Sequence, residues 1–70
     1  MGYVLGYRRT DGTTVTLTRP QGSSFLDHCD WAVRTSQRPD VAEAWISCRR
    51  EGGIVRHHWA GGREVASGDD

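Results

Sequence analysis

The sequence of 70 residues contains no lysine and no asparagine, and it has only two cysteines and two prolines. No stretch approaches the roughly 20 apolar residues that a membrane-spanning helix needs. The N-terminus lacks a basic segment followed by an apolar one, which is the pattern of a secretory signal. We therefore expect a cytoplasmic protein with no membrane partner, in which both cysteines are free thiols.

The chain also lacks an excess of either charge, because nine basic residues balance nine acidic ones. A net charge near zero gives no general attraction to nucleic acid or to a membrane surface. All nine basic residues are arginine, whose planar guanidinium suits carboxylate, phosphate or aromatic partners. No glycine-rich phosphate loop or other cofactor motif is present, so we expect no cofactor and no enzymatic activity.

The short length limits the hydrophobic core. Seventy residues make one domain at most. A domain of this size buries little apolar surface and is marginally stable alone. A second copy of the chain is therefore a reasonable partner.

The N-terminal residues 2–19 have the pattern of a β-hairpin. Asp11-Gly12 is a strong signal for a two-residue turn, and the β-branched run from Thr13 to Thr18 favours a strand. In the register that this turn predicts, Tyr7 faces Thr16. One face of the hairpin then carries Tyr3, Leu5, Tyr7, Arg9, Thr14, Thr16 and Thr18.

A helix is predicted from Phe25 to about Ser36. Ser24 and Asp27 resemble a capping box at its start, and Arg38-Pro39 ends it. At about 100° per residue, one stripe of this helix is apolar or small. Its members are Phe25, Leu26, Cys29, Ala32, Val33 and Ser36.

The segment 41–50 fits a helix and a strand equally well by its periodicity. We predict a strand from about Ala42, because Gly52-Gly53 and the apolar run Ile54–Trp59 would complete a second hairpin. In the register that this turn predicts, Cys48 faces His57 and Arg49 faces Arg56.

Together these elements predict an α+β fold of the order ββαββ. The four-stranded antiparallel sheet would have the strand order 2-1-3-4, with one helix packed on one face. Gly6, on a central strand, would let the helix approach closely. Residues 1–62 would form a single domain and residues 63–70 a flexible tail. This layout is common in small bacterial proteins with unrelated roles, so it implies no function.

One helix leaves the other face of the sheet uncovered, and that face is predicted to be too aromatic for contact with water alone. We expect a small protein-interaction or regulatory module that forms a homodimer or docks another protein there. Self-association would bury Tyr3, Leu5, Tyr7, Trp45 and Ile54. The candidate binding residues are Tyr3, Tyr7, Trp45, Arg49, Arg56 and His58.

Nucleic-acid binding is the alternative for the same face. Aromatic rings on a sheet can stack on bases while arginines hold phosphates. The zero net charge and the lack of an RNA-recognition motif argue against it.

A metal site is a second alternative. Cys29, Cys48 and His57 could converge between the helix and the sheet. The chain has neither a CxxC nor an HxxxH spacing, so this pattern is weak. Buried cysteines more often act as small hydrophobic residues.

Overall fold

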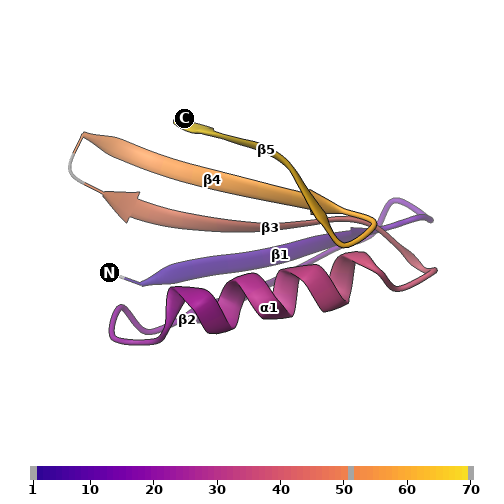
Figure 1. The fold of residues 1–70 in the computed structure, drawn as a ribbon, viewed down its shortest axis with the longest axis horizontal. Coiled ribbons are helices and arrows are strands. Elements are labelled where there is room, and N and C mark those ends of the chain that lie inside the picture. The colour runs from indigo at the N-terminus through magenta and orange to yellow at the C-terminus, as the bar shows by residue number, and fades with distance from the viewer. Residues whose placement is uncertain (1, 51, 70) are drawn as a thin grey trace.

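A computed structural model describes residues 2–50 and 52–69 of the chain. Its elements follow in the order β1 (Tyr3–Arg9), β2 (Thr14–Arg19), α1 (Phe25–Ser36), β3 (Val41–Arg50), β4 (Gly53–Ala60) and β5 (Arg63–Asp69) (Figure 1). Over these residues the strands form one antiparallel sheet in the order β2-β1-β3-β4-β5. The α+β class and the predicted neighbours of β1 to β4 are confirmed, but the predicted number of four strands is wrong.

The fifth strand comes from residues 63–69, which were expected to belong to a tail. Ala60 pairs with Arg63 across a loop of Gly61 and Gly62. Both glycines have positive φ, +61° and +84°, as a two-residue hairpin turn of type I′ requires. The Gly-Gly pair therefore continues the sheet instead of ending it (Figure 1).

The first hairpin forms as predicted, but its turn is one residue longer. The Gly12 N–H donates to the Arg9 carbonyl at 2.9 Å, and the Arg9 N–H donates to the Thr13 carbonyl at 2.8 Å. Gly12 has φ +94°. This is a three-residue loop with a glycine bulge. The sequence Asp11-Gly12 is compatible with this loop as well as with the two-residue turn.

The longer turn shifts the pairing of β1 and β2 by one residue. Leu5 pairs with Leu17 and Tyr7 with Val15, whereas the two-residue turn predicted Thr18 and Thr16. A shift of one residue moves every side chain of one strand to the opposite face relative to its partner. Tyr3, Leu5 and Tyr7 consequently lie on the same side as α1, and the predicted position of these three side chains is wrong.

The helix has the predicted bounds. Ser24 is its N-cap, and the Asp27 N–H donates to the Ser24 hydroxyl at 3.4 Å. The inner stripe is rotated from the prediction: His28 and Thr35 are buried, whereas Leu26 is 77% exposed. Three of the four buried residues of the helix are therefore polar, and the periodicity of apolar residues did not reveal His28 and Thr35 among them.

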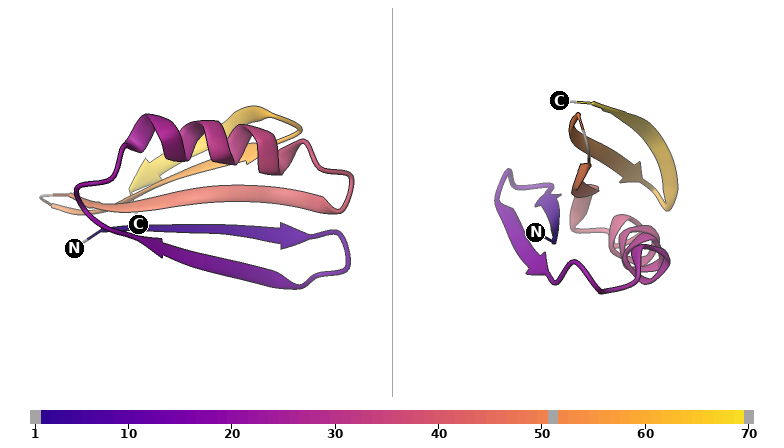
Figure 2. Two further views of the ribbon diagram at one scale, coloured as in Figure 1. Left: turned by 90° about the horizontal axis from the view of Figure 1, so that it is seen from below. Right: turned by 90° about the vertical axis from the view of Figure 1, so that its left-hand side faces the viewer.

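The core lies between α1 and the middle of the sheet. It is built from Leu5, Ala32, Ala44, Ile46 and Trp59. The helix packs mainly on β3, and no Cα atom of β2 lies within 8 Å of a Cα atom of the helix. In the right-hand view of Figure 2, the helix lies on one side of the sheet below β3 and β4, with the β1–β2 hairpin to the left.

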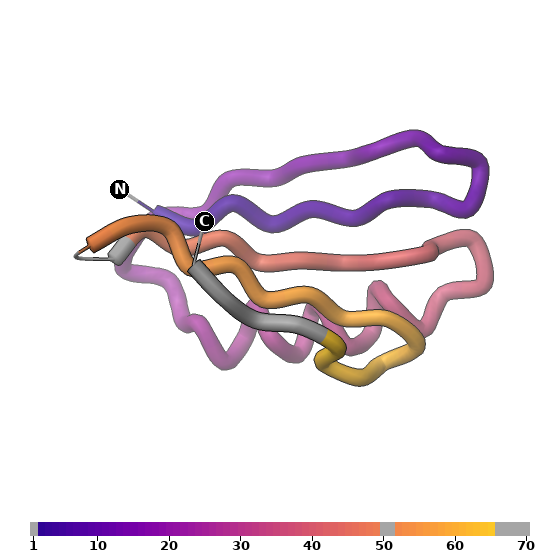
Figure 3. The backbone as a smooth tube through the Cα atoms, turned by 90° about the horizontal axis from the view of Figure 1, so that it is seen from above, coloured from indigo at the N-terminus to yellow at the C-terminus, as the bar shows by residue number. Residues whose placement is uncertain are grey.

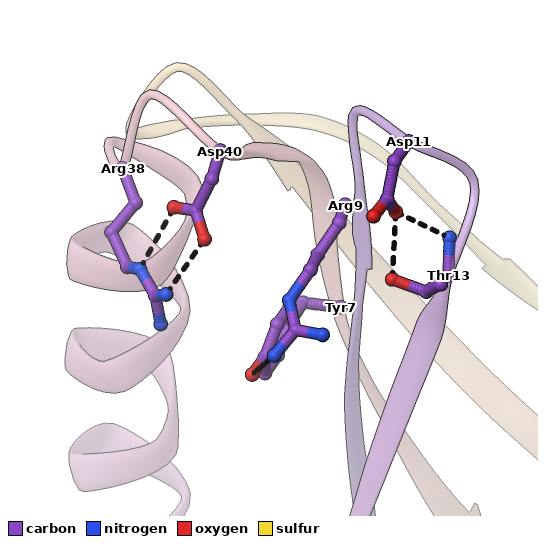
Figure 4. A network of polar contacts seen from close by, with 6 residues as sticks. All are labelled: Tyr7, Arg9, Asp11, Thr13, Arg38 and Asp40. Atoms are coloured by element: carbon purple, nitrogen blue, oxygen red, sulfur yellow. Dashed lines mark hydrogen bonds and ion pairs between the residues drawn. The ribbon is translucent and has the colours of Figure 1, made fainter.

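A backbone hydrogen bond joins the tip of the first hairpin to the loop after the helix, and Figure 4 shows the side chains around it. The Thr10 N–H donates to the Asp40 carbonyl at 2.9 Å. Arg38 donates two hydrogen bonds to the Asp40 carboxylate, at 2.8 and 3.1 Å. The guanidinium carbons of Arg9 and Arg38 each lie 5.6 Å from the centre of the Tyr7 ring. The two guanidinium groups therefore cover the Tyr7 ring, one from the hairpin and one from the loop after α1.

Candidate binding face

The sheet has one face turned away from α1, which we term the open face. Of the six predicted binding residues, Trp45, Arg49, Arg56 and His58 lie on it, and Tyr3 and Tyr7 do not. The strand registers place alternate residues of β1 to β4 there: Val4, Gly6, Arg8, Thr14, Thr16, Thr18, Glu43, Trp45, Ser47, Arg49, Ile54, Arg56 and His58.

Tyr3 and Tyr7 belong to the helix side of the sheet. The Tyr3 ring lies 6.0 Å from that of Phe25 and 5.0 Å from that of His28 between centroids. The Tyr7 ring lies 6.3 Å from that of Trp31. Both tyrosines are partly buried against the core and so are placed to support the fold.

The pairing register between β3 and β4 is also shifted from the predicted one, by two residues. Arg49 pairs with Ile54 and Ser47 with Arg56, so the predicted pair of opposing arginines is wrong. A shift of two preserves the face of each side chain. Arg56 Nε instead donates a hydrogen bond to Ser47 Oγ at 3.0 Å.

Trp45 lies over Gly6 in the middle of the open face. The two residues pair across β1 and β3. A Cβ atom at Gly6 would come within 2.5 Å of Cε2 and Cζ2 of the indole, so only glycine leaves room for the ring in this position. Gly6 was predicted to let the helix approach closely. This prediction is wrong, because the group that lies against Gly6 is the Trp45 indole on the open face, away from the helix.

His58 and Glu43 flank the indole. The ring centroids of His58 and Trp45 lie 6.4 Å apart. His58 Nδ1 is 3.5 Å from Glu43 Oε1, and it is a buried nitrogen without a hydrogen bond among the described residues.

A shallow pocket of about 290 Å³ opens beside this row of side chains. Val4 and Ile54, which line this pocket, are 40% and 37% exposed. The sequence prediction missed this pocket, because the two-residue turn placed Val4 on the helix side. A three-residue turn at Asp11-Gly12 would have put Val4 and Ile54 on one face. The lining residues are Gly2, Val4, Ser47, Cys48, Arg49 and Ile54.

Basic side chains outnumber acidic ones among the described residues of the open face. Arg8, Arg49 and Arg56 lie there with one acidic side chain, Glu43. The outer side of α1 is mixed, because Asp30 and Arg34 form an ion pair of 2.8 Å and Asp27 is exposed. The open face is therefore the more basic side of the described chain.

On the helix side, Ser23 and His28 lie close enough to resemble a catalytic pair. Ser23 Oγ is 2.8 Å from His28 Nε2. The same hydroxyl donates its only proton to the Pro20 carbonyl, so His28 Nε2 must donate to Ser23. In this arrangement the imidazole does not act as a base toward the hydroxyl, and the pair fixes the turn before α1.

The residues proposed for a metal do not form a ligand set. Within residues 2–50 and 52–69, no three or more His, Cys, Asp or Glu side chains are placed to hold a metal ion. His57 Nδ1 lies 2.8 Å from Glu64 Oε2, and both cysteines are free. Burial raises the pKa of the Cys29 thiol, and the negative charge of Glu64 raises it further. A protonated thiol is a poor metal ligand and a poor nucleophile.

No protein family model, curated protein or solved structure matches this chain. In the part of the chain that the structure describes, no helix has the length and apolar character needed to cross a membrane.

Proposed function

We propose that this protein is a non-enzymatic interaction module that docks another protein through the open face of its sheet. The observation that carries the proposal is the apolar pocket between Val4 and Ile54, with Trp45 on the same face. Protein interfaces commonly have an apolar centre that receives an anchor side chain, surrounded by polar groups. We place this activity in a reducing cytoplasm, where Cys29 and Cys48 stay thiols.

The partner that fits has an apolar side chain next to acidic ones. Arg49 lines the pocket, and Arg56 and Arg8 lie on the same face. Arginine at an interface suits a carboxylate, to which it can donate two hydrogen bonds. A leucine- or phenylalanine-sized anchor flanked by glutamate or aspartate would match both the pocket and the basic character of this face.

A second copy packed face to face fits this surface less well. Tyr3, Leu5 and Tyr7, which self-association through this face was expected to bury, lie on the helix side. Such a pair would also bring two sets of arginines together, which is unfavourable. These two points favour a different protein on the open face.

The nucleic-acid alternative loses its aromatic platform for a related reason. Tyr3 and Tyr7 do not lie on the open face. Among the described side chains there, the Trp45 ring remains for stacking on a base, and the neighbouring His58 ring is partly buried. Binding to an oligonucleotide would show a steep loss of affinity with salt. We therefore include single-stranded oligo(dT) as a test ligand.

The test starts from a random peptide library selected on the purified protein. We expect the selected peptides to combine one large apolar residue with several acidic ones. A synthetic peptide of the consensus is then titrated by calorimetry. Stronger binding of oligo(dT) than of any selected peptide would contradict the proposal.

Two exposed apolar residues provide a matched pair of variants. Ile54 lies on the open face, and Leu26 is more exposed but lies on the helix. Ile54→Glu should weaken the consensus peptide at least about tenfold, the effect of losing an anchor contact. Leu26→Glu adds the same charge and should leave the affinity unchanged. Equal losses in both variants would show that the peptide does not occupy the pocket.

A further inference from the structure

The strand β2 forms one edge of the sheet, and its inner side chains are incompletely covered. Over the described residues it pairs with β1 alone. The helix does not reach it, as its Cα atoms stay more than 8 Å away. Val15 and Leu17 are therefore only partly buried on the helix side. Figures 2 and 3 show β2 as the outermost strand, next to β1. An edge strand with two partly exposed apolar side chains would be stabilised if another strand paired with it and buried them.

The edge of β2 also lacks the usual protection against pairing. Charges, prolines and bulges keep most edge strands from adding a further strand. Residues 14–18 have none of the three, and their pairing with β1 is regular. The other edge differs, because β5 begins with Arg63 and Glu64 and its pairing with β4 contains a register shift.

The backbone groups of β2 that no neighbouring strand pairs with belong to three threonines. Of these groups, the Thr18 carbonyl accepts a hydrogen bond from the exposed side chain of Arg19, from Nη1 at 3.3 Å, which a pairing strand would replace. Thr13 accepts a hydrogen bond from Arg9, so its carbonyl points toward β1. In an antiparallel pair, successive residues point their backbone groups to alternate sides of the strand. Val15 and Leu17 therefore also bond toward β1. Thr14, Thr16 and Thr18 direct their N–H and C=O groups to the free edge.

We propose that a second copy of this chain pairs antiparallel with β2 about a twofold axis at Thr16. A symmetric dimer requires the same strand on both subunits, and an antiparallel pair of identical strands meets that requirement. With Thr16 on the axis, Thr14 pairs with Thr18 of the partner subunit, so the three outward-pointing threonines bond one another. This register uses the whole free edge from residue 14 to residue 18.

The same register matches the side chains. Val15 faces Leu17 of the partner subunit on the helix side, and the reverse pair forms across the axis. Cross-strand pairs of β-branched and aliphatic residues and of threonines stabilise sheets. Arg19 comes opposite Thr13 of the partner subunit, beside the turn that holds Asp11 of the partner subunit, so charges of opposite sign meet at both ends.

The dimer does not depend on the proposed docking of another protein. Joining two β2 strands produces one continuous sheet with both helices on one side and both open faces on the other. Two copies of the pocket would then face the same direction. A partner with two acidic apolar segments would be held more tightly by such a pair than by one subunit.

The test uses sedimentation equilibrium of the full chain and two variants at the axis. A residue on a twofold axis faces itself, so Thr16→Glu places two negative charges together and Thr16→Lys two positive ones. Each variant should raise the dimer dissociation constant by up to about fivefold, since opposed like charges cost up to ~1 kcal/mol. An equimolar mixture of the two variants should restore dimers, because glutamate then faces lysine.

Val65→Glu on the opposite edge strand is the control and should leave the dimer unchanged; Val65 is 59% exposed. Circular dichroism checks that all variants are folded. A wild-type chain that stays monomeric up to about 1 mM would overturn the proposal. Folded variants that dimerise as well as the wild type, or fail to pair when mixed, would also overturn it. Loss of the dimer in Ile54→Glu alone would place the second copy on the open face instead.

Discussion

Replacing Gly6 with alanine tests whether the Trp45 indole lies against the sheet as described. The added Cβ atom would lie 2.5 Å from two carbons of the ring. Ordinary contacts between carbon atoms are about 3.5–4.0 Å, so the ring must move by roughly 1 Å or more. That movement would lift the indole from the sheet and disturb its contact with His58.

Two opposing effects set the magnitude. Inserting a methyl group into a packed site costs about 1–3 kcal/mol. Alanine in place of glycine in a strand contributes about 0.5–1 kcal/mol in the other direction, because the unfolded chain loses freedom. We therefore expect Gly6→Ala to lower the free energy of unfolding by about 1 kcal/mol. For a domain of this size the melting temperature should fall by roughly 4–8 °C.

A double-mutant cycle with Trp45→Ala isolates the contact. Without the indole the methyl group meets no ring, so Gly6→Ala should become stabilising by about 0.5–1 kcal/mol in that background. Urea unfolding followed by far-ultraviolet circular dichroism measures all four proteins without relying on tryptophan fluorescence. If Gly6→Ala has the same effect in both backgrounds, the indole does not lie over Gly6.

Two further predictions concern ionisable groups. Because burial and the Glu64 charge raise the pKa of Cys29 above 9.0, its alkylation by iodoacetamide at pH 8 should be slower in the folded chain than in urea, and Glu64→Gln should speed it. Faster reaction in the folded chain would contradict this assignment. The Thr13 backbone N–H and hydroxyl, which donate to the Asp11 carboxylate at 2.9 and 2.7 Å, lower the pKa of Asp11 below 3.8 (Figure 4). The stability from this contact is present above pH 3.8 and is lost as the pH falls through the lowered pKa. Asp11→Ala should therefore reduce the urea midpoint at pH 7 and not below that pKa, whereas a difference independent of pH would refute the role of the charge.

Local signals in the sequence predicted the helix and the class of the fold. Ser24 and Asp27 marked the start of α1, and Arg38-Pro39 marked its end, because capping and proline act within a few residues. The strand over 41–50 was chosen over a helix because the following segment needed a neighbour. That reasoning used pairing across the sheet, and the structure confirms the strand.

The register of the first hairpin could not be read from its turn. Asp11-Gly12 suits a two-residue turn and also a three-residue turn with Gly12 at positive φ. Val4 and Leu5 are adjacent apolar residues, so the alternation of β1 did not decide which of them faces the core. The choice between the turns moved Tyr3 and Tyr7 off the candidate site and moved Val4 onto it.

The fifth strand was missed although its signal was present. Gly61-Gly62 separates Trp59-Ala60 from Arg63-Glu64-Val65, which is the same pattern that predicted the preceding hairpin. The polar composition of the last residues favoured a tail instead. A strand at a sheet edge needs few apolar residues, because its backbone pairing with β4 holds it in the sheet.

Chemical-shift mapping of the peptide site tests the central claim, that the open face binds a partner, most directly. The ¹⁵N-labelled protein is titrated with the selected acidic peptide, and the shifted backbone amides are assigned. The largest shifts should fall at Val4, Trp45, Ser47, Arg49 and Ile54. Largest shifts along the outer side of α1, at Leu26, Asp30 and Arg34, would contradict the claim.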